Sequence, residues 1–411
     1  MNILIVSQYF WPENFRVNDL ALALRDRGHS VTVLTGTPNY PSGRFFDGHG
    51  WFRRSSENWK GVEIRRCPLI ARGSGGGLRL ALNYASFALF ASLLGPWKCP
   101  GKFDAIFVHE PSPITVALPA LVLRRLRRGP VLLWVLDLWP ESVTAAGSVR
   151  SPLVLGMIGR LVRFIYRHCD RVLVQSRGFI ARVHAQGADP TRVLYFPSWA
   201  EAMFTQATQP PRPLPVALPS GFRILFAGNI GAAQDFETIL AAAELLRDIK
   251  EIHWVVVGDG RMAGWVREQV LARGLTDTVH LTGAFPLETM PPLFAAADAL
   301  LVTLKADPIF ALTIPGKIQS YLACGRPVVG MLDGEGANVL RESGAARVGP
   351  SGDAKALATN VMALYQMRGE ARQAMGEAGR AYYRQHFERD RLMTQLEQWF
   401  NQARDGGSPA N

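Results

Sequence analysis

Short runs of consecutive apolar residues recur along the chain, and they alternate with segments of helical periodicity. The first two runs are Met1–Ser7 and Ser30–Thr35, and between them a helix is predicted from Arg16 to Arg27. A strand that helices cover on both faces is apolar at every position, so these runs predict buried parallel strands. Further strands are predicted in this half of the chain at Val62–Cys67, Asp104–His109, Val131–Asp137 and Arg171–Gln175.

The same alternation starts again after a proline-rich stretch. Phe222–Gly231 opens with an apolar strand, and a helix is predicted over about Asp235–Arg247. Two such series predict an α/β chain of two Rossmann-like domains, each a doubly wound parallel sheet, that face each other across a cleft. Further strands are predicted at Trp254–Gly258, Val279–Thr282, Ala299–Thr303 and Pro327–Gly330.

These segments divide the chain into an N-terminal domain over 1–205, a linker over 206–220 and a C-terminal domain over 221–385. A length of 411 residues is sufficient for two separate cores. The remaining segment, 386–411, is predicted to hold a helix that crosses back to the N-terminal domain, followed by a disordered tail.

Positive charge is concentrated in the first half of the chain. Residues 1–200 hold 25 Lys and Arg against 12 Asp and Glu, whereas residues 201–411 hold 20 against 22. Such a basic domain is typical of proteins that meet nucleic acid or an anionic membrane. The apolar segment Leu78–Trp97, with basic residues upstream, favours peripheral attachment to the membrane, and a buried helix is the alternative. The basic residues upstream are Arg65, Arg66, Arg72 and Arg79.

Metal and disulfide chemistry have no signature in this sequence. The four cysteines form no Cys-x-x-Cys pair, and no Asp-x-Asp element stands at a predicted strand end. Met1 leads directly into a strand, without the basic region of a secretory signal. We therefore expect a protein of the cytoplasm with reduced thiols and no metal site.

Glycine-containing turns follow three strands of the second half. Gly228-Asn229-Ile230-Gly231 lies between a strand and a helix, where backbone N–H groups and the helix dipole favour a phosphate. Gly258-Asp259-Gly260-Arg261 follows the next strand, and Leu281-Thr-Gly-Ala-Phe285 ends another. One such turn is a weak signal, because many turns need glycine for geometry alone. Three at one sheet edge predict a shelf for a nucleotide.

Several motifs, taken together, resemble the retaining GT-B glycosyltransferases of family 4, and the likeness spans almost the whole chain. They are Tyr9-Phe-Trp-Pro-Glu13, Arg27-Gly-His-Ser-Val-Thr-Val33, Phe226-Ala-Gly-Asn-Ile-Gly231, Val257-Gly-Asp-Gly260 and Tyr321-Leu-Ala-Cys-Gly-Arg-Pro-Val328. The chain is most similar to the branch that builds colanic acid, capsule and O-antigen. That likeness lies in Thr35-Gly-Thr-Pro-Asn-Tyr-Pro-Ser-Gly43 and Asp137-Leu-Trp-Pro-Glu-Ser142.

This resemblance implies a nucleotide-sugar donor, UDP-linked, in the C-terminal domain and an acceptor in the basic N-terminal domain. The acceptor would be a polyprenyl-diphosphate-linked sugar on the inner face of the cytoplasmic membrane. Transfer would retain the anomeric configuration, use no cofactor and be metal-independent, with the leaving diphosphate taking the acceptor proton. A UDP-sugar 2-epimerase of the same fold is the alternative enzyme, and a nucleic-acid-binding protein is the alternative outside enzymes.

The chain departs from the family at the phosphate site. The family's Arg and Lys after the phosphate-loop glycine are absent from Asn229–Gln234, and its paired glutamates fall at about Leu312 and Ser320. Lys317 and Arg261 are the candidate replacement cations, and Glu335 is the candidate carboxylate; the alternative for each is a solvent-exposed side chain. The full set of donor-binding candidates is Gly228, Asn229, Ile230, Gly231, Gln234, Gly258, Asp259, Gly260, Arg261, Phe285, Lys317, Ser320 and Glu335.

Polar residues at strand ends of the first half complete the candidate site, because carboxyl ends of parallel strands carry function in this architecture. The acceptor-binding candidates are Glu13, Asn14, His109, Glu110 and Asp137. The alternatives are a buried core histidine for His109 and a surface residue of the first helical turn for Arg16. The catalytic candidates are Lys317, Asn14, Arg16, Asp137 and Glu110.

Overall fold

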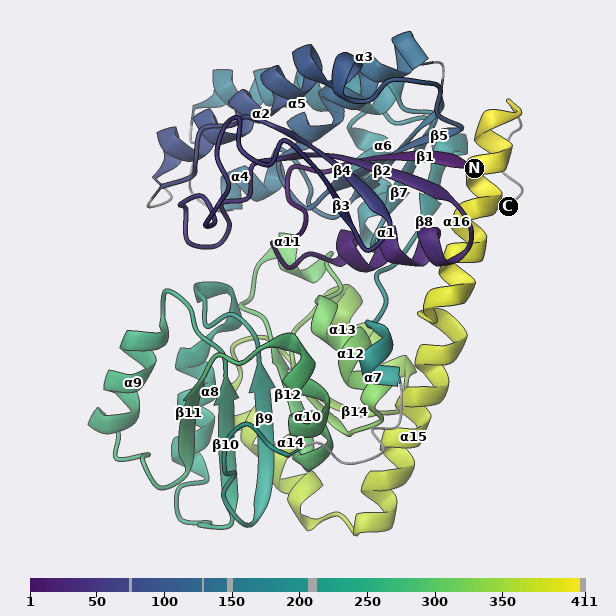
Figure 1. Cartoon of the computed structure of the whole chain (residues 1–411). Coiled ribbons are helices and arrows are strands. Elements are labelled where there is room, and N and C mark those ends of the chain that lie inside the picture. The colour runs from purple at the N-terminus through teal and green to yellow at the C-terminus, as the bar shows by residue number, and fades with distance from the viewer. Residues whose placement is uncertain (74–75, 128, 146–150, 206–212, 407–411) are drawn as a thin grey trace. The chain divides into compact units, whose positions relative to one another are not determined.

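The structure, a computed structural model, describes residues 1–73, 76–127, 129–145, 151–205 and 213–406 (Figure 1). The chain divides into two compact units. Unit 1 comprises Met1–Pro197 and the chain from Asp390 onward, and unit 2 comprises Ser198–Arg389. Each unit is built around one sheet.

The sheet of unit 1 has eight strands in the order β3-β4-β2-β1-β5-β6-β7-β8, and all pairs are parallel except β3 with β4. Ile3 of β1 lies in register with Val31 of β2 and Ala105 of β5. The strand order therefore reverses between β1 and β5, and ligands of such sheets bind beyond the carboxyl ends of strands at that point. The strands are β1 (Asn2–Val6), β2 (Ser30–Gly36), β3 (Ser56–Trp59), β4 (Val62–Cys67), β5 (Ala105–Glu110), β6 (Val131–Val135), β7 (Arg171–Val174) and β8 (Val193–Tyr195).

Helices cover the sheet of unit 1. Three of them, α2, α3 and α5, lie side by side, with α3 in contact with both others (Figure 1). The last helix, α16, also belongs to this unit, because Phe400 packs edge-on against Phe107 of β5 and Glu397 pairs with Arg27 after α1. The helices are α1 (Arg16–Asp26), α2 (Gly77–Lys98), α3 (Ala117–Arg127), α4 (Glu141–Ala145), α5 (Pro152–His168), α6 (Gly178–Ala185) and α16 (Arg389–Arg404).

The sheet of unit 2 has six parallel strands in the order β11-β10-β9-β12-β13-β14. Its order also reverses beside its first strand, here between β9 and β12, as in nucleotide-binding sheets. The strands are β9 (Phe222–Ala227), β10 (Ile252–Val257), β11 (Val279–Gly283), β12 (Ala299–Thr303), β13 (Val328–Met331) and β14 (Ala346–Gly349).

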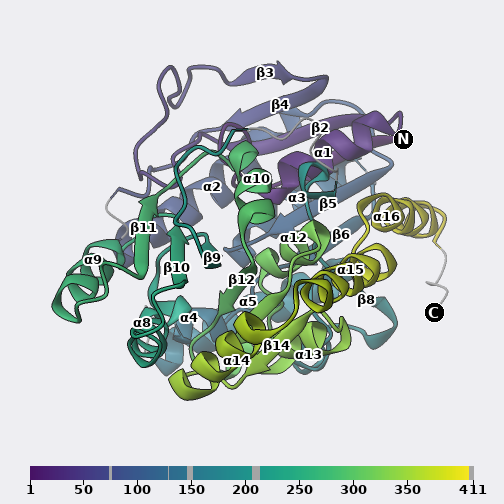
Figure 2. The same cartoon turned by 90° about the horizontal axis from the view of Figure 1, so that it is seen from below.

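Side chains of these strands alternate between two cores. Leu225 of β9 packs in one core with α10, α12 and α13, whereas Phe226 packs in the other with α8, α9 and α14. Helix α15 runs beside α12 (Figure 2). The helices are α7 (Ala202–Thr205), α8 (Phe236–Leu245), α9 (Ala263–Ala272), α10 (Met290–Ala296), α11 (Pro308–Ala311), α12 (Gly316–Cys324), α13 (Gly334–Glu342), α14 (Ala354–Gln366) and α15 (Gly369–His386).

The predicted pair of parallel-sheet α/β domains is confirmed. The division between the units falls at 197/198 instead of 205, because the segment with α7 packs on unit 2. Of the predicted linker and tail, residues 206–212 and 407–411 lie outside the described residues. Strands β3, β8 and β14 were not predicted from the sequence.

Candidate functional site

The three glycine turns of unit 2 meet at the carboxyl edge of its sheet. The N–H of Gly228 donates to Val257 O at 2.9 Å, and the N–H of Gly258 donates to Gly283 O at 2.8 Å. Ile230 N–H donates to Asp259 O at 2.9 Å. By contrast, the N–H groups of Asn229 and Gly231 have no acceptor within the part of the chain that the structure describes. Two unsatisfied donors on a glycine turn favour an anion there.

Close backbone contacts explain two of these glycines. A Cβ atom on Gly258, where φ is +150°, would lie 1.9 Å from Gly228 O, and a Cβ on Gly260 would lie 2.4 Å from Ile230 O. Neither position tolerates a side chain without moving the backbone. Glycine is therefore required at these two positions by the close approach of one turn to another.

Lys317 stands at the first turn of α12 and reaches this turn. Its Nζ donates to Gln234 Oε1 at 3.1 Å and lies 3.8 Å from the centroid of the Phe226 ring. It also lies against Gly228, where an added Cβ would be 3.4 Å from Nζ. No acidic side chain pairs with it among the described residues, and burial lowers the pKa of the ammonium group to about 7. An anion bound here would supply the missing countercharge.

The other donor candidates are placed as follows. Asn229, Asp259 and Arg261 are exposed, and Glu335 lies half-buried in the first turn of α13. Phe285 packs against the core that contains α10 and α12. Ser320 is 6 % exposed on α12, and its contact with the donor stays a prediction.

The sequence did not reveal three groups that hold the segment from Ala227 to Gln234 in place. This segment contains Gly228–Gly231, the turn predicted to bind phosphate and named the phosphate turn. Thr303 Oγ1 donates to Gln234 O at 2.6 Å, and Lys305 N–H donates to Ala233 O at 2.9 Å. The hydroxyl of Tyr321 on α12 accepts the N–H of Ala227 at 3.1 Å. For Thr303, the only signal in the sequence was its position at the end of a predicted strand, because its partner Gln234 is 69 residues away.

At the carboxyl edge of the unit 1 sheet, Glu13 is buried, and its carboxylate already accepts hydrogen bonds from the backbone. Its carboxylate accepts the N–H groups of Phe10, Asn39 and Tyr40 at 3.2, 2.8 and 2.7 Å. Burial raises the pKa of Glu13 to about 7, although the three N–H donors oppose this shift. Glu13 thus ties two loops together, and its contact with the acceptor stays a prediction; Asn14 beside it is exposed and Arg16 is half-buried.

His109 is buried at the end of β5, close to the point where the strand order reverses. Its Nδ1 lies 3.0 Å from Ser7 Oγ, and that hydroxyl donates to Tyr9 O at 2.7 Å. Because the Ser7 hydrogen is used, the geometry assigns the proton of His109 to Nδ1. Burial lowers the pKa of His109 to about 3, so the ring is neutral and Nε2 is the acceptor.

Glu110 and Asp137 form a pair of acids at the ends of β5 and β6. Glu110 is fully buried, and no described residue makes a hydrogen bond of ordinary geometry with its carboxyl group. Burial and the nearby charge of Asp137 raise the pKa of Glu110 well above its usual value. Burial also raises the pKa of Asp137, to about 6, against hydrogen bonding from Ser142, Ser112 and Trp139. Burial therefore favours the protonated form of both carboxyl groups relative to their ordinary titration in water.

Metal and membrane features are sparse. No group of three or more His, Cys, Asp or Glu side chains among the described residues could hold a metal ion. One helix in the described ranges, α2, is long and apolar enough to cross a membrane, and 28 % of its apolar window is buried.

The order of the strands in the two sheets defines an α/β protein with two Rossmann-like units. Residues 14–199 match the family model described as a glycosyl transferase 4-like domain, and residues 221–367 match that of glycosyl transferases group 1. The two matches cover most of the chain, which belongs to the family 4 glycosyltransferases of GT-B fold.

Two curated relatives are similar to this chain. The putative colanic acid biosynthesis glycosyl transferase WcaI of Escherichia coli K12 is 26 % identical over 345 residues, which cover 79 % of this chain and 82 % of WcaI. The probable glycosyltransferase WbjE of Pseudomonas aeruginosa is 28 % identical over 235 residues. That second match covers 55 % of this chain and 58 % of WbjE, so it spans little more than half of either protein.

Solved structures share the fold at low sequence identity. Anabaena HepE, in complex with UDP and glucose, has a TM-score of 0.68 and 14 % identity, covering 98 % of this chain and 99 % of HepE. WaaG, a glycosyltransferase involved in lipopolysaccharide biosynthesis, has a TM-score of 0.65 and 14 % identity, covering 97 % of this chain and 99 % of WaaG.

Proposed function

We propose that this chain transfers a sugar, with retention of its anomeric configuration, from a UDP-sugar to a lipid-linked acceptor during assembly of a surface polysaccharide. The observation that carries the proposal is the ammonium of Lys317, which lies without a countercharge against the glycine turn at Gly228. The role of WcaI in colanic acid biosynthesis and the UDP bound to HepE support the acceptor class and the donor.

In this proposal the donor diphosphate lies between the turn and the start of α12. The N–H groups of Asn229 and Gly231, the positive end of α12 and the ammonium of Lys317 would bind this diphosphate together. These donors stabilise the charge that develops on the diphosphate as the sugar leaves. The leaving diphosphate accepts the proton of the incoming hydroxyl on the same face of the sugar, so no carboxylate nucleophile and no metal ion are required.

Unit 1 supplies the acceptor side of the proposal. Sugar hydroxyls both donate and accept hydrogen bonds, and the carboxyl groups of Glu110 and Asp137 at the ends of β5 and β6 offer partners for them. The neutral ring of His109 adds an acceptor at Nε2. These groups would bind and orient hydroxyls of the acceptor.

The outer helices of unit 1 support attachment to the anionic inner leaflet of the cytoplasmic membrane. Apolar side chains are exposed along α2 and along α5, where exposed arginines lie among them. Apolar and basic residues on one helical surface are typical of interfacial binding. The exposed apolar residues are Leu78, Leu82, Leu89, Leu93 and Trp97 on α2, and Leu153, Val154, Met157 and Phe164 on α5.

Two residues of the predicted membrane patch have other roles. Phe87 of α2 is fully buried in the core. Arg66 is 2 % exposed, pairs with Glu57 and donates to Trp11 O at 2.7 Å. A membrane test must therefore target the exposed residues of α2 and α5 in place of these two.

Donor screening with acceptor extension tests the function. Purified protein is mixed with UDP-, GDP- and dTDP-sugars, with and without a polyprenyl-diphosphate sugar, and both UDP and extended lipid are measured. The proposal expects UDP release in proportion to extended lipid, with an unchanged anomeric configuration. Epimerised UDP-sugar without acceptor would support the 2-epimerase instead, and an inverted product would exclude retention.

A further inference from the structure

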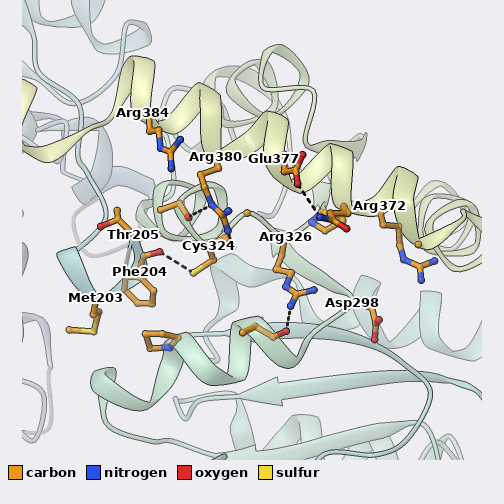
Figure 3. Close-up of a pocket in the computed structure, with 17 residues that line it drawn as sticks. Met203, Phe204, Thr205, Asp298, Cys324, Arg326, Arg372, Glu377, Arg380 and Arg384 are labelled. Carbon is orange, nitrogen blue, oxygen red and sulfur yellow. Dashed lines mark hydrogen bonds between the residues drawn. The ribbon is translucent and has the colours of Figure 1, made fainter. Parts of the chain in front are cut away.

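A pocket of about 720 Å³ opens at the amino-terminal edge of the unit 2 sheet (Figure 3). Asp298 and Arg326 line it, directly before β12 and close before β13. The phosphate turn lies at the other edge, and the five residues of β12 separate the two edges by roughly 15 Å. This pocket is therefore distinct from the candidate donor site, and its volume is in the range that holds a small organic ligand.

Positive charge dominates the lining of this pocket. Four arginines face two acidic residues, and one of the acids is already paired, since Asp298 Oδ2 accepts both the N–H and the Nε of Arg223 at 2.9 and 3.2 Å. The other acid, Glu377, is exposed and accepts from Gln373 Nε2 at 3.0 Å. The arginines are Arg326, Arg372, Arg380 and Arg384.

Three of the guanidinium groups also hold the carboxyl ends of helices. Arg380 Nη2 donates to Cys324 O of α12 at 2.9 Å, Arg326 donates to Ala295 O of α10, and Arg372 donates to Leu364 O of α14 at 3.0 Å. A guanidinium has five N–H donors, so these contacts leave others for a ligand. Arg384 makes no hydrogen bond or ion pair with any residue in the described ranges, and its side chain extends from α15 on the side of Arg380 (Figure 3).

Glycines fix Arg380 in this arrangement. A Cβ atom on Gly325, where φ is +66°, would lie 2.6 Å from Arg380 Nη2. A Cβ on Gly376 of α15 would lie 2.1 Å from Gly325 O, so α15 packs directly on the end of α12. This close packing places the guanidinium of Arg380 against the end of α12. Met203 and Phe204 of α7, together with Pro291, supply an apolar wall.

We propose that this pocket binds an organic phosphate and acts as an effector site for the donor site. Planar guanidinium groups match phosphate oxygens in pairs, and the apolar wall suits a ring attached to the phosphate. Coupling runs through α12, because Arg380 caps its last carbonyls while Lys317 stands in its first turn. A phosphate that binds the remaining N–H groups of Arg380 changes how firmly this guanidinium holds the end of the helix.

Calorimetric titration tests the binding. The probes are inorganic pyrophosphate, AMP and glucose 6-phosphate, added to the Lys317→Ala protein so that the donor site contributes little. At least one organic phosphate should bind, and Arg384→Ala in the same background should weaken it about tenfold or more. The matched control is Arg267→Ala, an exposed arginine of α9, which should leave binding unchanged.

Three outcomes would overturn the binding proposal. They are no binding of any probe at millimolar concentration, equal binding in the Arg384→Ala protein, and pyrophosphate binding as tight as that of AMP and glucose 6-phosphate. Circular dichroism and the melting temperature check that Arg384→Ala is folded, which its lack of partners predicts.

UDP affinity tests the coupling, which rests on the proposed donor site. In protein with Lys317 intact, a saturating probe should change the Kd for UDP about fivefold or more, and Arg384→Ala should abolish that change. An unchanged Kd for UDP would overturn the coupling. Failure of UDP to bind at all would count against the proposed function, whereas probe binding in the Lys317→Ala protein reports on this pocket alone.

Discussion

The two sheets of this chain have the same order around their first strands, yet their carboxyl edges carry opposite chemistry. In unit 2 this edge presents glycine backbone, two N–H groups for which the described residues supply no acceptor, and the ammonium of Lys317, for which they supply no countercharge. In unit 1 it presents the buried side chains of Glu13, His109 and Glu110, with Asp137 beside them. Topology thus fixes where a ligand binds, while the residues at the strand ends select its charge. An anion fits the first edge, and an uncharged ligand rich in hydroxyls fits the second.

The largest expected effect follows from removing the cation of unit 2. Lys317→Ala should lower kcat/KM for UDP release about a hundredfold, because loss of one charge-stabilising donor in an active site costs roughly 3 kcal/mol. Lys250→Ala is the matched control, since that lysine is exposed and 3.9 Å from Asp277. Near-normal turnover of the Lys317→Ala protein would remove Lys317 from the site.

A second change tests the glycine backbone of the same edge. Gly258→Ala should weaken UDP binding about tenfold or more, because its Cβ would lie 1.9 Å from Gly228 O and displace the phosphate turn. Calorimetry measures the Kd, and the melting temperature reports separately on stability. Gly264→Ala, with nothing within 4 Å of its added Cβ, should change neither quantity. Equal UDP affinity in both variants would refute the role of this turn.

The outer surfaces of the units should differ in membrane binding. The triple variant Leu89→Ser, Leu93→Ser, Trp97→Ser should lose most of its sedimentation with anionic liposomes, because these exposed side chains of α2 would enter the interface. The unit 2 control is Leu245→Ser with Leu271→Ser, which are similarly exposed. Binding of the unaltered protein should fall as salt rises. If the unaltered protein, the triple variant and the control all fail to sediment with anionic liposomes at low salt, membrane attachment is refuted and a soluble acceptor is favoured.

Donor affinity should also depend on pH through Lys317. Burial sets the pKa of its ammonium group at about 7 in the free protein, and a bound diphosphate raises that pKa by supplying a countercharge. UDP binding therefore takes up a proton, and affinity falls as pH rises above about 7, by at most about tenfold per pH unit. Calorimetry in buffers of different ionisation enthalpy measures the uptake. A Lys317→Ala protein with the same pH profile would assign the effect to another group.

The smallest expected effect is that of chelation. Transfer should proceed at an unchanged rate in EDTA, because Lys317 and the backbone N–H groups act in place of a metal ion in the proposed mechanism. UDP release before and after dialysis against EDTA measures this. A loss of activity that magnesium or manganese restores on titration would show that a metal ion holds the diphosphate.

Sequence patterns predicted the strands well where a strand is buried on both faces. The run Ala299–Thr303 is apolar at most positions and forms β12 with the predicted bounds. Strand β3 was not predicted, because Ser56–Trp59 lies at the sheet edge and carries polar residues. Pattern alone does not reveal an edge strand that depends on its neighbour for pairing.

The environment of individual site residues was harder to predict, because distant partners decide it. The buried carboxylate of Glu13 accepts hydrogen bonds from N–H groups 26 and 27 residues away in the sequence. The buried guanidinium of Arg66 pairs with the carboxylate of Glu57 on the neighbouring strand β3. Tyr321 lies 94 residues from the N–H that it accepts. The glycine turns were predictable because a turn is local, whereas each of these contacts exists only after the sheets have formed.

Helix α16 has a consequence for how the chain is made. Unit 1 needs this helix, since Trp399 and Phe400 cover Phe196 and Phe107 of its sheet. A ribosome, however, completes the whole of unit 2 before it reaches residue 390. During synthesis, the aromatic surface of unit 1 at Phe107 and Phe196 therefore stays uncovered by α16 until unit 2 has been synthesised. A fragment that stops at residue 197 keeps that surface exposed permanently, and it should aggregate when produced alone.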